Sequence, residues 1–348
     1  MLARLPRSTA IFVVLLFLGA CAWCLSTPSG KVSKAAKGHY TDMMLFRDIV
    51  AQVDAGKDYY TAAAETQRAH RYPTRPFVTI REPTLYVAAS EFGWAALNRL
   101  EMILAGMVIV IWLLALPPPV MWAERLIATG CVAVACLAPI ATSLTPMSET
   151  WCGLLLALAL GLMLWTRSRW WMPVIVITAA LALRELALPF ALLAAAFALW
   201  DRRWHELAAW GGVLAVFAAG LAWHAANVAA VQLPTDLHSP GWAGVLGLRG
   251  VLLALSNTTI LHRLPSGYAQ LIALLPALGW LSLSGRRGAF AALLLFGYAL
   301  MIALFSRSDN FYWGFTMVPA WFAGLALVPR ALGQLTGAIT RPRSSPLH

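Results

Sequence analysis

The chain has few charged side chains, and this scarcity excludes an ordinary soluble protein. Of its 348 residues only 12% are Asp, Glu, Lys or Arg, whereas 60% are hydrophobic and the mean hydropathy is +0.70. A soluble domain with this composition would not have enough polar side chains to cover its surface. The composition therefore indicates a membrane protein.

Cysteine is also scarce, and none lies in a loop. The five cysteines fall within or at the edge of apolar segments, at Cys21, Cys24, Cys131, Cys136 and Cys152. A disulfide framework or a structural zinc site would need cysteines at characteristic spacings outside such segments. We therefore expect neither, and we interpret the Cys-x-x-Cys spacing at the first pair as packing on an apolar helix.

Acidic residues are few, with 15 against 26 basic residues and a net charge of +11. Many of the basic residues lie in short turns between apolar segments or in the C-terminal tail, notably Arg125, Arg167, Arg169, Arg202, Arg203, Arg286, Arg287, Arg330, Arg341 and Arg343. Short loops rich in Lys and Arg stay in the cytoplasm, so we interpret the charge as a topology signal that is helped by attraction to membrane lipids. We expect no nucleic-acid partner.

Apolar segments long enough to suggest membrane crossings recur along the whole chain. Each crossing by a helix needs roughly 20 apolar residues. The predicted spans are about 10–25, 94–116, 126–141, 151–165, 170–183, 185–200, 207–231, 268–283, 289–305 and 311–328. The predicted fold class is an all-α integral membrane protein with about ten transmembrane helices and both termini in the cytoplasm.

We find no internal repeat and no appended soluble domain. Residues 1–338 are therefore expected to form one polytopic domain, and residues 339–348 a disordered cytoplasmic tail. Two outer segments are long, residues 27–93 and residues 232–267. Within the second, the apolar stretch Val245–Leu255 is too short to span the bilayer, so it predicts a re-entrant or surface helix.

The first outer loop contains a helical pattern. Met44, Leu45, Ile49 and Val53 recur at helical spacing after Thr41-Asp42, which predicts an amphipathic helix at the membrane surface that ends at Gly56. Tyr59 and Tyr60 follow, and the prolines of Tyr72-Pro73-Thr74-Arg75-Pro76 require an extended chain.

This order of motifs resembles the bacterial GT-C class of polytopic glycosyltransferases. The resemblance rests on the early Asp42, the predicted interfacial helix, the Tyr-Tyr segment and the Tyr-Pro-Thr-Arg-Pro-Phe run; further outer motifs are Ser148-Glu149-Thr150-Trp151, Arg184-Glu185, Ser239-Pro240-Gly241-Trp242 and Asp309-Asn310-Phe311-Tyr312-Trp313. It implies transfer of a sugar from a polyprenyl-phosphate donor to a lipid, glycan or protein acceptor. The reaction would take place on the periplasmic face of the bacterial inner membrane.

The resemblance also implies roles for individual residues. Asp42 is expected to act as general base for the attacking hydroxyl, because the carboxylate of this class lies early in the first outer loop. Expected substrate contacts are Tyr60, Arg81, Glu149, Arg184, Glu185, Arg263, Arg307 and Asp309, with the arginines holding the leaving phosphate. The loop lacks the Asp-x-Asp pattern that holds a divalent ion in many members, so we expect no metal or other cofactor.

Simpler interpretations of these residues stay open. Asp42 has the position of a helix cap, and Glu149 that of a cap for the following span. Arg184 and Glu185 could neutralise each other at a turn, and Asp309 belongs to a segment typical of an interfacial aromatic belt. For the whole protein, the alternatives are a transporter or flippase of a lipid-linked or anionic substrate and a noncatalytic scaffold.

Overall fold

The computed structural model describes residues 2–27, 40–116, 120–141, 143–165, 169–242 and 244–341. Over these residues the chain is helical, and its only β pairing is an isolated bridge between Arg75 and His238. The beginning of the first outer loop and the end of the predicted tail, residues 28–39 and 342–348, lie outside the described residues.

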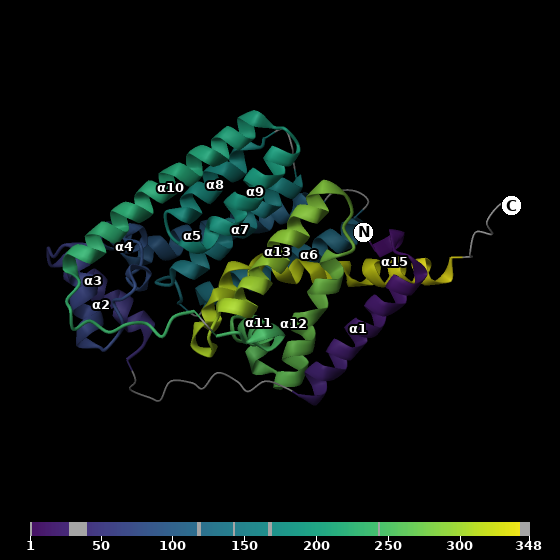
Figure 1. Ribbon diagram of the computed structural model, residues 1–348, viewed down its shortest axis with the longest axis horizontal. Helices are drawn as coiled ribbons and strands as arrows, with labels where there is room; N and C mark the ends of the chain where they lie inside the picture. Colours follow the sequence, from purple (N-terminus) through teal and green to yellow (C-terminus); the bar gives the residue numbers. More distant parts are fainter. Residues whose placement is uncertain are drawn as a thin grey trace.

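An outer layer of short helices covers one end of the molecule, at the left in Figure 1. It consists of α2 (Asp42–Asp54), α3 (Tyr59–Ala69), η2 (Phe77–Thr79) and α4 (Thr84–Phe92). The apolar face of α2 was predicted to lie on the membrane. The structure instead packs that face against α3 and α4, and buries Leu45, Phe46, Ile49 and Val50.

The remaining helices form the bundle beneath this layer. The first group is η1 (Leu2–Arg4), α1 (Arg7–Ser26), α5 (Trp94–Ala115), α6 (Trp122–Ala141), α7 (Ser148–Trp165), α8 (Trp171–Leu181), η3 (Glu185–Ala187), α9 (Leu188–Trp200) and α10 (Trp204–Val231). The second is α11 (Gly247–Asn257), η4 (Ile260–Arg263), α12 (Ser266–Trp280), α13 (Gly285–Phe305), η5 (Ser308–Thr316), α14 (Val318–Trp321), η6 (Phe322–Leu327) and α15 (Val328–Thr340).

Seven segments are long and apolar enough to cross a membrane within the described residues: α1, α5, α6, α7, α10, α13 and the continuous segment Val318–Thr340. The other predicted spans correspond to α8, α9 and α12, which have 11, 13 and 15 residues. At about 1.5 Å per residue, each of these three is shorter than the hydrocarbon core of a bilayer. The structure thus identifies a helical membrane protein with at least these seven candidate crossings.

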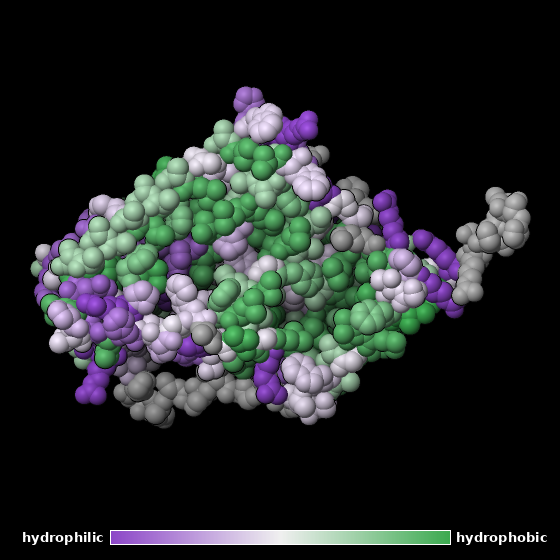
Figure 2. Space-filling view, in the orientation of Figure 1, coloured by the Kyte–Doolittle hydropathy of each residue, from purple (hydrophilic) through white to green (hydrophobic). Residues whose placement is uncertain are grey.

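Hydrophobic surface separates two polar regions of the molecule (Figure 2). The length of α10 gives the distance between these two polar regions. The helix begins beside the arginine-bearing turns and ends where Arg68 of α3 donates to the carbonyl oxygen of Val231. Its 28 residues correspond to about 42 Å. At its beginning, Arg286 pairs with Asp201, and Arg287 donates to the Leu164 carbonyl oxygen, so three arginine-bearing turns meet there.

The last apolar run differs most from its predicted form. Instead of one α-helix over residues 311–328, the chain alternates between 3-10 and α-helix from Ser308 onwards, and then continues as α15 through Thr340. The predicted tail therefore starts later than residue 339.

The short apolar segment near residue 250 is also not a surface element: α11 packs against α12, α13 and η5 with Val251, Leu252 and Leu255 buried.

Close backbone contacts fix this irregular segment inside the bundle. A Cβ atom at Gly279 of α12 would lie 1.8 Å from the carbonyl oxygen of Gly324, and one at Gly153 of α7 would lie 2.1 Å from that of Phe315. Only glycine allows this approach, because the obstructing atoms belong to backbone. Helices α12 and α7 therefore contact the final segment through Gly279 and Gly153, positions where only glycine fits.

Substitution of Gly279 by alanine should destabilise the fold by about 1–3 kcal/mol, as expected for overpacking of a tight core contact. Gly297 of α13 is the matched control, because nothing lies within 4 Å of a Cβ atom there. Thermal unfolding in detergent should show a lower midpoint for Gly279→Ala and an equal or higher one for Gly297→Ala. Equal midpoints for the two variants would contradict the close contact.

Candidate functional site

A buried carboxylate joins two arginines at the junction of the outer layer and the bundle. Oε1 of Glu149 lies 2.9 Å from Nη2 of Arg81 and 3.0 Å from Nη2 of Arg184. Glu149 is fully buried, and Arg184 is 2% exposed. Three residues that the sequence predicted as separate substrate contacts therefore form one ionic cluster.

Local structure explains how the three side chains reach one another. Glu149 occupies the first turn of α7, where the helix dipole favours a negative charge. Arg184 has an extended backbone, with φ −161° and ψ 125°, which breaks the apolar run into α8 and α9 and turns the side chain inward. Arg81 precedes α4, and its carbonyl oxygen accepts a 2.7 Å hydrogen bond from the Tyr59 hydroxyl of α3.

The cluster contains two Arg-Glu dipeptides that lie against each other. Nη1 of Arg184 bonds to Oε2 of its neighbour Glu185 at 2.9 Å. Burial, and then the nearby negative charge of Glu185, raise the pKa of Glu82 to about 8, and a hydrogen bond between the two carboxyl groups acts in the same direction. Glu82 therefore carries a proton at neutral pH. Two guanidinium groups then face two carboxylates, Glu149 and Glu185.

Asp42 lies in the outer layer, in the first turn of α2. Its Oδ1 accepts a 2.9 Å hydrogen bond from the Tyr72 hydroxyl, while the cap of α2 is formed by the Thr41 side chain, which accepts from the backbone N–H of Met44. The carboxylate of Asp42 is thus not the helix cap. Burial and the negative charge of Asp42 raise the pKa of Tyr72, which keeps its hydroxyl available as a donor.

Tyr312 connects Asp42 with the arginines. The Arg81 guanidinium lies 5.9 Å from the centre of the Tyr312 ring, and the Tyr312 hydroxyl donates to Oδ1 of Asn310 at 3.2 Å. This hydroxyl lies within electrostatic reach of Asp42 as well as of Arg81, Glu149 and Arg184. The segments around residues 81, 149, 184 and 312 therefore converge on one region, and Asp42 lies within electrostatic reach of Tyr312 there.

The other predicted contacts lie apart from the ionic cluster. Tyr60 bonds to Nδ1 of His224 at 3.2 Å, and burial followed by the charge of Asp58 raises its pKa to about 12. Arg307 binds Asp309 through both guanidinium arms and donates to the Gly241 carbonyl oxygen at 2.7 Å. This arginine therefore ties two outer turns together. Arg263 is exposed on η4.

An apolar groove begins beside the cluster. It has a volume of about 230 Å³ and lies between α8 and α10, with Leu181, Val213 and Phe217 among its lining residues and with Glu82 and His224 at its polar end. A second apolar groove of about 330 Å³ lies between α6, α12 and η6, with Thr259, Ile260 and Leu261 at its border. Both grooves have mostly aliphatic or aromatic walls.

Sequence reasoning missed Glu82 and Tyr72 as site residues. A signal was present for Glu82, because the Arg-Glu dipeptide that singled out residues 184–185 also occurs at residues 81–82. Tyr72 carried no comparable signal, since its role depends on contact with a residue 30 positions away. Among the described residues, no three His, Cys, Asp or Glu side chains are grouped as a metal site would require.

Comparison of the chain with models of protein families, with curated proteins and with solved structures finds no match. The site therefore has to be interpreted from its own geometry.

Replacement of Glu149 by glutamine should destabilise the protein by about 3–5 kcal/mol, because Arg81 and Arg184 would lose the carboxylate that they share. Asp309→Asn is the matched control: it also removes one arginine-bound carboxylate, but this side chain is 65% exposed, and the expected loss is below about 1 kcal/mol. Chemical unfolding in detergent measures both. Losses of similar size would show that the buried cluster stabilises the protein no more than an exposed ion pair does.

The raised pKa of Glu82 predicts a pH dependence of stability. The folded state holds its proton up to about pH 8, whereas the unfolded chain loses it near 4.5. Unfolding free energy should therefore fall as the pH rises from about 4.5 to about 8 and level off above that. Glu82→Gln should flatten this slope in thermal unfolding measured across the same range. An unchanged slope in the variant would show that another group is responsible.

Proposed function

We propose that the protein is an inverting glycosyltransferase that moves a sugar from a polyprenyl-phosphate donor to an acceptor hydroxyl at the outer face of the membrane. The observation that carries this proposal is the Arg81–Glu149–Arg184 cluster beside Tyr312, whose hydroxyl lies within electrostatic reach of Asp42, the hydrogen-bond partner of Tyr72. Transfer from a phosphate leaving group requires a carboxylate to accept the proton and guanidinium groups to hold the phosphate.

Asp42 would be the base. Tyr72 holds Oδ1, and no described residue hydrogen-bonds Oδ2, which leaves that oxygen to accept the proton of the attacking hydroxyl. In the transfer step the acceptor oxygen bonds to the anomeric carbon and the bond from that carbon to the phosphate oxygen breaks. The electron pair leaves with the polyprenyl phosphate, and the proton passes to Asp42.

Arg184 would bind the leaving phosphate. Its Nε is buried and has no hydrogen-bond partner, an unusual situation for a charged donor. A phosphate oxygen would supply the missing acceptor. Because Glu149 and Glu185 already balance the charges of both arginines, the phosphate would be held by directed N–H contacts rather than by excess positive charge.

The groove between α8 and α10 supports the same assignment. It carries apolar walls from the lipid-facing side of the bundle to Glu82, which belongs to the cluster. An isoprenoid chain in this groove would place its phosphate beside Arg184. In this proposal the chain crosses the bacterial inner membrane about ten times, the short α8, α9 and α12 included, with the termini in the cytoplasm and the site facing the periplasm.

The charge distribution favours this enzyme over a transporter or flippase. Residues 151–165, 207–231 and 288–305, which form most of α7, α10 and α13, contain no Asp, Glu, Lys or Arg. Transport paths for anionic substrates usually place ionisable groups near the middle of the membrane. Here the described ionic cluster lies at one end of the bundle.

Asp42→Asn should lower the transfer rate at least about a hundredfold, the scale expected for loss of a positioned general base. The assay follows release of polyprenyl phosphate from a polyprenyl-phosphate sugar by the purified protein in detergent. Asp54→Asn is the matched control, since this exposed residue lies on the same helix and should leave the rate unchanged. Full activity of the Asp42 variant would reject the base assignment.

A further inference from the structure

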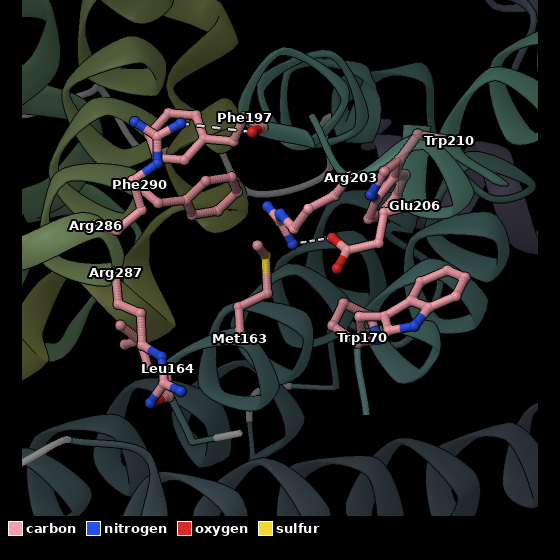
Figure 3. A pocket seen from close by; sticks show the side chains of 11 residues that line it. Met163, Leu164, Trp170, Phe197, Arg203, Glu206, Trp210, Arg286, Arg287 and Phe290 are labelled. Carbon is pink, nitrogen blue, oxygen red and sulfur yellow. Dashed lines mark hydrogen bonds and ion pairs between the residues drawn. The ribbon is translucent and has the colours of Figure 1, made fainter. Parts of the chain in front are cut away.

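The end of the molecule opposite to the ionic cluster contains a small charged cavity. It lies among α7, α8, α9, α10 and α13 and encloses about 50 Å³. This is room for several water molecules or one phosphate group, on the scale of about 10–15 Å³ per enclosed water. Figure 3 shows Arg203 and Glu206 on one side of the cavity, the Arg286 guanidinium against Phe197 on the other side, and Met163 between them.

The cavity has an excess of positive charge. Five arginines line or flank it, at positions 169, 202, 203, 286 and 287, and the acids among its described neighbours are Asp201 and Glu206. Arg203 pairs with Glu206, and Nη2 of Arg286 lies 2.9 Å from Oδ1 of Asp201. Both guanidinium groups stay partly exposed, at 29% and 34% of their side chains, so they remain accessible to a further anion.

Exposed tryptophans show at which depth the cavity lies. Trp171, Trp200 and Trp204 are 50%, 80% and 60% exposed and belong to the same helix ends that form the cavity. Tryptophans in such positions mark the boundary between lipid headgroups and acyl chains. Below them, Leu192, Leu199 and Val216 expose aliphatic surface on α9 and α10.

Guanidinium groups at headgroup depth, above lipid-facing aliphatic surface, match one kind of ligand. We propose that this cavity binds the phosphate of an anionic phospholipid, whose acyl chains lie along the exposed surface of α9 and α10. Basic pockets between transmembrane helices are suited to such headgroups because arginine binds phosphate oxygens in pairs. The site is independent of sugar transfer, since it lies at the other end of α10 from Arg81 and Arg184.

The test titrates the purified full-length protein in mixed micelles with phosphatidylglycerol, phosphatidylcholine or inorganic phosphate, and counts bound molecules by native mass spectrometry. We expect saturable binding of phosphatidylglycerol at least about tenfold tighter than that of phosphatidylcholine. Arg203→Gln/Arg286→Gln should weaken phosphatidylglycerol binding about tenfold or more. The control Arg4→Gln/Arg341→Gln removes the same charge from exposed residues outside the cavity and should leave binding unchanged.

If the first double variant does not fold, Arg169→Gln/Arg202→Gln removes two exposed arginines from the rim and should weaken binding about fivefold or more. Equal affinity for the two phospholipids would overturn the proposal, as would equal losses in the cavity and control variants. Competition by inorganic phosphate as strong as that by phosphatidylglycerol would show that the cavity binds free anions instead. Sugar transfer enters none of these measurements.

Discussion

The carboxylate of Glu149 is the contact on which the outer half of this structure depends. It is fully buried and lies about equally far from the guanidinium groups of Arg81 and Arg184. Removing three charges from water costs several kcal/mol per ion, and their mutual attraction offsets this cost only while all three are present. The cluster therefore requires the segments that carry them to pack together, and it penalises arrangements that leave one of them alone.

One attachment of the outer layer to the bundle lies around Arg81. The Tyr59 hydroxyl donates to its backbone carbonyl, and the neighbouring carbonyl of Ile80 is bonded to Nε2 of His224, whose other nitrogen meets Tyr60. Residues 80 and 81 therefore join three parts of the fold. The Arg81 side chain contacts Glu149, and the backbone carbonyls of the two residues are bonded to α3 and α10. Tyr72 and Asp42 lie within electrostatic reach of Tyr312, and among the described residues Asp42 makes no ion pair with the arginines.

Much of the helical framework could be predicted from the sequence, because apolar runs bounded by charged residues determine where membrane helices begin and end. Helices α5, α7, α10 and α13 begin within four residues of their predicted positions. The irregular segment after Ser308 could not be predicted, since its form depends on backbone contacts at Gly153 and Gly279, which are far away in sequence. The breaks that shorten α8 and α9 arise from the extended Arg184, a residue that the sequence did single out.

For the candidate site, the sequence identified residue types that are costly to bury, and Arg81, Glu149, Arg184 and Glu185 indeed lie together. It did not show that one carboxylate would serve two arginines, or that Glu82 would share a proton with Glu185. Such pairings depend on which turns meet in space. Arg263 and Arg307 carried the same sequence signal, but the fold places the first on the surface and uses the second to join two outer turns.

The most direct test of this account is amide hydrogen exchange over α3 and α4 in the wild-type protein and in Glu149→Gln, measured under conditions in which both remain folded. If Glu149 anchors the outer layer through Arg81, exchange over residues 59–69 and 84–92 should become faster in the variant, while exchange in α13 stays unchanged. Unchanged protection of α3 and α4 would contradict the central role of this carboxylate.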